Sequence, residues 1–256
     1  MVTAAARMIL QLLSGLGRYS ILLFLAFKIP RDVNVRLYAR NLSEQMVRIG
    51  VESIPIVALS TAFLGGVAAV QSLYQLNSPF LPTTLVGSFT EQTVMLELAS
   101  LVMAFVLSGR VGARIAAELG TMRVTEQIDA LEAMGINSRS YLIVPRVAAG
   151  VLMFPMLYVI ACGVGLAAGA LVAAGSPELT TDTFWVGARE FFKPYDAFFG
   201  LIKATIFGFI ITSVSCYKGY FTTGGAEGVG SSTTQATVVS CVFVLLADYV
   251  LAVVLL

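Results

Sequence analysis

Charged residues interrupt several long apolar stretches of this sequence: Glu97, with Glu91 in the same stretch, Lys203 and Asp248. A charge in the middle of a bilayer is unfavourable by about 2.5–3.5 kcal/mol on insertion scales, so such residues usually pair or serve a function. Lys203 lies near the start of its stretch and Asp248 near the end of the next one. Because these two ends fall on the same side of the membrane, the residues lie at similar depth, which predicts an ion pair between them. The alternative is that Lys203 extends its ammonium group to the surface.

Glu97 lies near the middle of its stretch and has no cation within one helical turn on the same stretch. A lone carboxylate there is expected to border a hydrated cavity, to meet a polar group of a ligand, or to carry a proton. Gln71 and Tyr74 of the preceding stretch are expected to line the same wall. The alternative is a purely structural hydrogen bond from protonated Glu97 to a neighbouring helix.

The residues needed for most enzymatic chemistry are absent. The sequence contains no histidine, which excludes Ser-His-Asp and Cys-His catalysis and histidine-ligated metals. Cys162, Cys216 and Cys241 lie far apart in apolar runs, so we expect no disulfide framework, no metal site and no cofactor. The net charge of +1 predicts no nucleic-acid partner. No phosphate-binding loop occurs, so any ATP would be hydrolysed by a partner protein.

The composition identifies the elements that must position these charges. Of the 256 residues, 57% are hydrophobic and 12% are charged, against about 25% charged in soluble domains. Long apolar runs without strand-like alternation predict an all-α integral membrane protein. Five runs are long enough to span a bilayer: about 53–76, 87–109, 143–174, 198–217 and 233–256, of which the third is interrupted by Pro145 and Pro155.

The N-terminal region, residues 1–50, differs from the five spans. Residues 31–49 form an amphipathic pattern with an apolar stripe and a basic opposite face, which is typical of a helix lying in the membrane interface. The stripe consists of Val35, Tyr38, Leu42, Met46 and Ile49. Residues 4–28 are apolar but contain three basic residues; we expect them to lie flat beside 31–49, and a further span is the alternative.

Basic residues are distributed unequally between the two sides of the predicted spans. Thirteen Lys and Arg residues fall on the side of the N-terminus and two on the opposite side, with Lys203 inside a span. The positive-inside rule therefore places the N-terminus in the cytoplasm and the C-terminus outside.

The 110–140 segment is the longest polar stretch on the cytoplasmic side. We expect a helix that begins after Thr121 or Thr125 and ends at Gly135. Its apolar side and acidic remainder suit a protein groove better than an anionic lipid surface, and the alternative is a solvated linking helix.

Glycines mark two further places. Gly165, Gly169 and Ala173 form a small-residue stripe that permits close helix packing. We expect this packing within one subunit, and a seam between two subunits is the alternative. Four glycines crowd the 218–232 loop, which predicts a tight turn followed by a helix capped by Ser231 or Ser232.

The segment SGRVGARIAAELGTMRVTEQIDALEAMGINSRSYLIVPR, residues 108–146, resembles the signature of the MlaE/YrbE permeases, the membrane subunits of Mce-type ABC lipid transporters. The resemblance extends to Gln71, Glu97, Pro155, Ile202-Lys203, Gly219-Tyr220, Thr233-Thr234 and Asp248-Tyr249, and covers about residues 50–256. One difference is that many members have Arg-Glu-Leu-Gly-Pro where this chain has Leu96-Glu97-Leu98-Ala99-Ser100, so its second span is expected to be straighter.

The resemblance implies an interfacial N-terminal region (1–50) and a five-span permease domain (51–256) in the bacterial inner membrane. It implies a homodimer that moves lipid, taken here as phospholipid. We expect the lipid path to be bordered by Glu97, Gln71, Tyr74, Lys203 and Asp248. Residues 110–135 would couple the permease to a cytoplasmic ATPase through Glu118, Arg123, Glu126 and Asp129. An external MCE-domain protein and a small STAS-like cytoplasmic subunit would be further partners.

Two other functions compete with this interpretation. A secondary transporter or channel could use Glu97, Lys203 and Asp248 for ions or protons, but five spans without an internal repeat do not favour it. An intramembrane lipid-modifying enzyme lacks histidine and any assembled acid–base motif.

Overall fold

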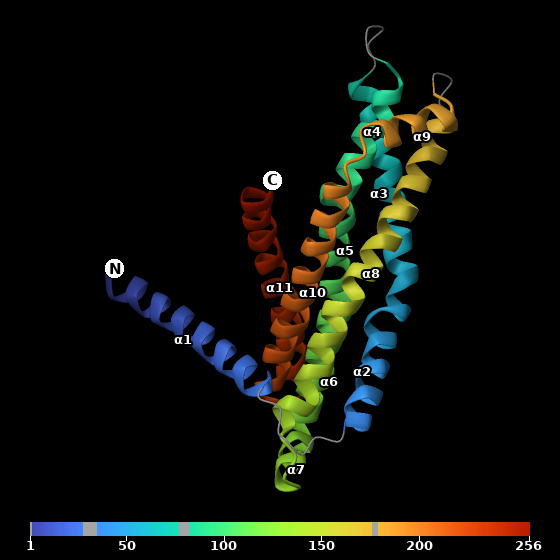
Figure 1. Cartoon of the computed structure of the whole chain (residues 1–256). Helices are drawn as coiled ribbons and strands as arrows, with labels where there is room; N and C mark the ends of the chain where they lie inside the picture. The colour runs from blue at the N-terminus through green and yellow to red at the C-terminus, as the bar shows by residue number, and fades with distance from the viewer. Residues whose placement is uncertain (1, 28–34, 77–81, 176–178) are drawn as a thin grey trace.

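The computed structural model describes residues 2–27, 35–76, 82–175 and 179–256, which form an elongated bundle of helices (Figure 1). Five helical stretches in these residues are long and apolar enough to cross a membrane: Tyr38–Gln75, Thr84–Val124, Ser138–Ala174, Pro194–Tyr220 and Gly225–Leu255. The predicted all-α membrane fold with five spans is therefore confirmed. We call the two ends of the bundle the α7 end and the α4–α9 end, after the helices that lie there (Figure 1).

The first spanning stretch joins α2 (Val35–Ile49), η1 (Val51–Ser53) and α3 (Ile54–Gln75), and α2 continues in line with α3 (Figure 1). The stripe residues Leu42, Met46 and Ile49 pack against the core, whereas the side chain of Val35 lies outside the described residues. The stripe thus contacts protein, and the interfacial position of residues 1–50 stays a prediction.

The helix α1 (Val2–Phe27) leaves the bundle sideways, and its C-terminal half is attached near the α7 end (Figure 1). Tyr19 shares a hydrogen bond of 2.7 Å with Ser213, and Ser140 donates one of 2.6 Å to the Ala26 carbonyl. Leu22 and Ala26 are buried. These contacts fix one end of α1 on the bundle.

The second spanning stretch is longer than the predicted 87–109. It joins α4 (Thr84–Thr93), η2 (Val94–Leu98), α5 (Ala99–Leu107), η3 (Ser108–Gly112) and α6 (Ala113–Val124), where η2 and η3 are single π-helical turns. The helix continues beyond residue 109 because Ile115, Ala116 and Leu119 are buried where α6 packs on α10 and α11. Half of the predicted polar loop is therefore an extension of the span.

The short helix α7 (Gln127–Ala133) follows a break at Glu126, which adopts a left-handed conformation with φ 58°. The predicted caps are wrong, since Thr125 follows α6 and donates its hydroxyl back to the Thr121 carbonyl. The predicted end of this helix at Gly135 is confirmed. Gly135 has φ 77°, and the Gly135 and Ile136 amides bond to the Glu132 and Leu131 carbonyls in a Schellman arrangement.

The third span, α8 (Ser138–Ala174), is one continuous helix that passes through Pro145 and Pro155. Pro145 has no amide hydrogen, which leaves the Tyr141 carbonyl without its usual helical donor. Asn41 of α2 donates to that carbonyl at 3.3 Å. Membrane helices tolerate proline when a neighbouring helix satisfies the freed group in this way, which explains why the predicted interruption does not occur at Pro145.

The last three helices are α9 (Thr181–Glu190), α10 (Pro194–Tyr220) and α11 (Gly225–Leu255). The sequence analysis did not predict α9, which begins with a capping box of Thr180 and Thr183 and packs on α4. The cap predicted at Ser231 or Ser232 is wrong, because α11 begins six residues earlier. Its start is set by Gly224 and Gly225, whose φ angles of 93° and 68° suit glycine.

Small residues let the spans approach closely. A Cβ atom on Gly65 of α3 would lie 2.0 Å from the Gly165 carbonyl oxygen of α8, and one on Gly169 would lie 3.1 Å from the Gly65 carbonyl oxygen. The stripe of Gly165 and Gly169 therefore packs within the subunit, as expected.

This contact predicts the effect of one methyl group. Gly65→Ala should lower the thermal unfolding temperature of the detergent-solubilised chain, because overpacking costs typically about 1–3 kcal/mol. Gly163→Ala on α8 is the matched control, since no atom lies within 4 Å of its Cβ position; it should leave the temperature unchanged or raise it. Equal unfolding temperatures for the two variants would contradict the close α3–α8 contact.

Candidate functional site

The site is centred on Lys203 of α10, whose side chain is fully buried. Its Nζ lies 2.8 Å from Glu97 Oε2 in η2 and 2.5 Å from Asp248 Oδ1 in α11. The first contact is also a hydrogen bond, whereas the second is an ion pair without hydrogen-bond geometry. One ammonium group thus connects three spanning helices. We call Glu97, Lys203 and Asp248 the buried ion triad.

The triad both confirms and corrects the sequence analysis. The predicted pair of Lys203 and Asp248 is confirmed, and the alternative in which Lys203 reaches the surface is not observed. The expectation that Glu97 lacks a cationic partner is wrong. That argument considered cations on the same span only, whereas Lys203 lies 106 residues away in sequence and reaches Glu97 from another helix.

The π turn η2 presents Glu97 and two backbone carbonyls to the neighbouring helices. In this turn the Ala99 amide bonds to the Val94 carbonyl, five residues back instead of four, which disturbs the regular ladder of backbone hydrogen bonds. The Met95 carbonyl accepts from the Tyr158 hydroxyl of α8 at 2.9 Å, and the Leu96 carbonyl accepts from Lys203 Nζ at 3.0 Å. Side chains from α8 and α10 therefore hold the turn in place.

The helix continues without a break through Ala99 and Ser100. The Ser100 hydroxyl donates to the Glu97 carbonyl at 3.2 Å, and Ser100 is fully buried. The irregularity in this span is thus the π turn just before these residues.

The triad is open on one side. The Glu97 side chain is 41% exposed and that of Asp248 is 16% exposed, whereas Lys203 is enclosed and lies over the Phe199 ring at 5.2 Å. With all three groups ionised, the triad has one positive and two negative charges. The exposed Glu97 carboxylate is therefore a polar position in an apolar wall that can meet water or the polar part of a ligand.

Gln71 and Tyr74 are not brought to the triad. They line an apolar groove of about 560 Å³ on the outer side of α3, together with Val67, Val70 and Val172 of α8. Tyr74 is 84% exposed there. Because Glu97 does not line this groove, the structure of one chain does not place these residues on a common wall.

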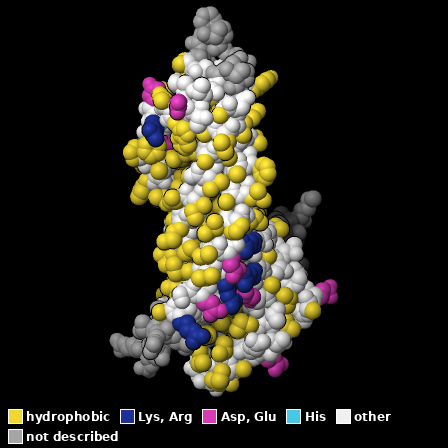
Figure 2. Space-filling view, turned by 90° about the vertical axis from the view of Figure 1, so that its right-hand side faces the viewer, with side chains coloured by type: hydrophobic (Ala, Val, Ile, Leu, Met, Phe, Trp, Pro, Cys, Tyr) yellow, Lys and Arg dark blue, Asp and Glu magenta, His cyan; other side chains and the backbone are white. Residues whose placement is uncertain are grey.

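A second polar region lies toward the α7 end, where Figure 2 shows acidic and basic side chains side by side below a broad hydrophobic surface. Glu118 of α6 contacts three arginines from three helices: Arg114 at 3.1 Å, Arg146 at 3.4 Å and Arg48 at 3.6 Å. Glu52 pairs with Arg114 at 2.7 Å. The candidate coupling residue Glu118 thus joins α2, α6 and α8 within the chain.

The other candidate coupling residues lie at the break between α6 and α7. Arg123 pairs with Asp129 across this break at 2.6 Å, and both side chains are well exposed. Glu126 is the exposed left-handed residue between them. We call Arg123, Glu126 and Asp129 the α6–α7 corner, and it is separate from the Glu118 network.

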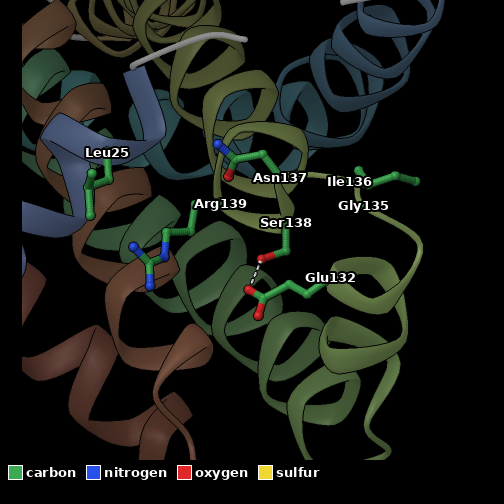
Figure 3. A pocket seen from close by; sticks show the side chains of 7 residues that line it. All are labelled: Leu25, Glu132, Gly135, Ile136, Asn137, Ser138 and Arg139. Carbon is green, nitrogen blue, oxygen red and sulfur yellow. Dashed lines mark hydrogen bonds between the residues drawn. The ribbon is translucent and has the colours of Figure 1, made fainter.

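A pocket of about 360 Å³ lies between the end of α7 and the start of α8 (Figure 3) and is lined by Leu25, Glu132, Gly135, Ile136, Asn137, Ser138 and Arg139. Glu132 accepts hydrogen bonds from Ser138 at 2.6 Å and from Tyr220 at 3.1 Å. These bonds lower the pKa of the Glu132 carboxyl, with Ser138 contributing most. The ionised Glu132 side chain therefore connects α7 to the start of α8 through Ser138 and to the end of α10 through Tyr220.

Several residues that build these sites were not singled out from the sequence. Tyr158 and Arg146 act through contacts between helices that are distant in sequence, and a local pattern does not reveal such contacts. Arg146 had a usable signal, since a basic residue next to an apolar run and a proline must find a partner.

The family model described as Permease MlaE matches residues 42–254. A "Probable ABC transporter permease protein" of Rickettsia bellii is 37% identical over 242 residues, which are 94% of this chain and 92% of the relative. The "Intermembrane phospholipid transport system permease protein MlaE" of Haemophilus influenzae is 30% identical over 98% of this chain and 95% of its own length. The Arabidopsis thaliana chloroplast protein TRIGALACTOSYLDIACYLGLYCEROL 1 is 36% identical over 87% of this chain and 63% of its own. By its family match and these identities, the chain belongs to the MlaE permease family.

Proposed function

We propose that this chain is the membrane subunit of an ABC transporter that moves phospholipid between the inner membrane and an external MCE-domain protein. A separate cytoplasmic ATPase supplies the energy, and the chain itself catalyses no reaction. The observation that carries the proposal is the buried ion triad, which places fixed charge in an apolar bundle with one carboxylate open. The Haemophilus relative is named as a phospholipid transport permease, which supports phospholipid as the substrate.

The exposed side of Glu97 is the proposed contact with the lipid. A lipid in transit has a polar headgroup that loses water inside an apolar bundle, and Glu97 offers a polar partner at that depth. Lys203 holds Glu97 in place through their ion pair and is shared with Asp248. Gln71 and Tyr74 would border the lipid from the separate α3–α8 groove.

The proposed assembly is a homodimer in which α11 faces the second copy. Only 11% of the apolar segment of α11 is buried inside the chain, whereas 39–56% of the apolar segment is buried in each of the other four spans. Asp248 is part of α11 and is linked to Glu97 through Lys203, so a symmetric partner would enclose their open side. Native mass spectrometry of the complex tests this, and a single copy per complex would contradict it.

The α7 end is the proposed cytoplasmic end. Arg48, Arg114, Arg123 and Arg146 contribute to the polar regions there, in accordance with the positive-inside rule. The N-terminus would then be cytoplasmic and the C-terminus periplasmic. The α6–α7 corner would meet the ATPase, with a small STAS-like subunit on the same side, and the family match favours this permease over a secondary transporter.

Changing Glu97 should reduce lipid transfer. In the reconstituted complex, Glu97→Leu should slow transfer of labelled phospholipid by about tenfold or more, because an uncompensated headgroup costs roughly 1–3 kcal/mol. Glu97→Gln keeps the shape and hydrogen bonding, so it should retain more activity. Glu227→Leu, which removes an exposed acid at the start of α11, is the control. Normal transfer by folded Glu97→Leu would show that Glu97 has no part in the path.

Charge reversal at the α6–α7 corner should release the ATPase. The double variant Arg123→Glu/Glu126→Arg keeps the net charge but inverts the exposed charge pattern, and like charges brought together at an interface cost several kcal/mol. We expect at least a tenfold lower yield of ATPase in co-purification. Arg189→Glu/Glu190→Arg makes the same exchange on exposed residues of α9 and should leave the yield unchanged. Full recovery with the corner variant would refute the docking site.

A further inference from the structure

A second buried acid, Glu91 of α4, lies outside the ion triad. The residue is 1% exposed, although it is a carboxylic acid in a spanning helix. Both of its carboxyl oxygens are buried, and neither has a hydrogen-bond partner among the described residues. This differs from Glu97, which has Lys203, and it calls for a physical explanation because buried polar groups are normally satisfied.

The packing of three helices defines the surroundings of Glu91. Tyr158 of α8 bonds to the Met95 carbonyl, and Gly200 of α10 packs so tightly on Tyr158 that a Cβ atom there would lie 2.0 Å from its hydroxyl oxygen. Glu91 lies one turn from Met95 on the way to the α4–α9 end. Cys162 and Asp196 lie one turn from Tyr158 and from Gly200 in the same direction, because helices place residues i and i+4 on one face.

Cys162 and Asp196 therefore fall beside Glu91, and both are buried. Asp196 and Glu91 are close enough to interact electrostatically, as are Glu91 and Cys162. The site is thus a buried layer between α4, α8 and α10 in which two acids lie within electrostatic range of each other.

No group around Glu91 compensates a negative charge. From α8 the titratable neighbours are Tyr158, whose hydroxyl already donates to Met95, and Cys162, and from α10 the neighbour is Asp196. The helix α9 packs on α4, but its charged residues are exposed: Asp182, Arg189 and Glu190. From α3 the polar neighbour is Ser72, which accepts a hydrogen bond from Thr90. Among the described residues, no lysine or arginine forms an ion pair with Glu91.

An ionised carboxylate in such a place would combine a large desolvation cost with repulsion from Asp196. Buried groups of this kind take up a proton and become neutral instead. The packed layer is therefore compatible with a neutral Glu91 and incompatible with a charged one.

We propose that Glu91 is a proton-binding site of this permease: its carboxyl holds one proton while α4, α8 and α10 are packed together and releases it when they separate enough to admit water. The packed state then binds one more proton than the opened state. Low pH favours the packed state, and each pH unit toward alkaline raises the opened fraction by up to about tenfold, the limit for one proton.

Infrared spectroscopy of the full-length chain in lipid nanodiscs tests the proton directly. The carbonyl stretch of a protonated carboxylic acid should be present at neutral pH in the wild type and absent in Glu91→Gln. Glu97→Gln is the control and should keep the band, since Glu97 pairs with Lys203. Retention of the band in Glu91→Gln would overturn the proposal, and its loss in Asp196→Asn alone would place the proton on Asp196.

Cys162 is a natural reporter of opening because it lies in the same layer. In a Cys216→Ser/Cys241→Ser background, maleimide labelling of Cys162 should rise with pH more steeply in the wild type than with Glu91→Gln. The ratio of the two rates removes the intrinsic pH dependence of the thiol and should increase by up to about tenfold per pH unit. A ratio that does not change with pH would refute the linkage.

A second variant covers the case in which Glu91→Gln does not fold. Glu91→Met replaces the carboxyl by an apolar group of similar length. If the native group is neutral, this variant should fold, and its labelling should rise with pH only as steeply as the ionisation of the thiol itself. If both variants fail to fold while the wild type shows no protonated carboxyl band, Glu91 is charged and compensated by another ligand, and the proposal is wrong.

Discussion

A positive charge buried among three membrane-spanning helices constrains the rest of this structure. Lys203 Nζ is removed from water, and only nearby negative groups make that position stable. Glu97, Asp248 and the Leu96 carbonyl supply them from two other helices. Because breaking a buried pair leaves an uncompensated charge, typically at a cost of about 3–5 kcal/mol, α10, α11 and the second span have one favoured arrangement.

The backbone irregularities of the spans are stabilised by the same means. The Tyr141 carbonyl freed by Pro145 accepts from Asn41, and the carbonyls of Met95 and Leu96 in η2 accept from Tyr158 and Lys203. In each case a side chain from a neighbouring helix satisfies a group that lipid could not. The close approach of helices at glycines such as Gly200 makes these contacts possible.

The sequence was sufficient for what depends on composition and local pattern. Five apolar runs predicted five spans, Gly135 predicted the end of α7, and matching depth predicted the pair of Lys203 and Asp248. What failed was set by tertiary packing: α6 extends the second span because its apolar side is buried, and α8 passes through Pro145 because Asn41 compensates. The partner of Glu97 was missed for the same reason, since helix pairing between distant segments is invisible to a local argument.

The stability of variants that remove one or all of the three charges tests the role of the triad most directly. Thermal unfolding of the solubilised chain should show that Lys203→Met lowers the free energy of unfolding by about 3–5 kcal/mol, because two carboxylates lose their cation. The triple variant Lys203→Met/Glu97→Gln/Asp248→Asn removes all three charges and should recover most of that loss. If Lys203→Met is as stable as the wild type, or if the triple variant is no more stable than Lys203→Met, the triad does not hold the three helices together.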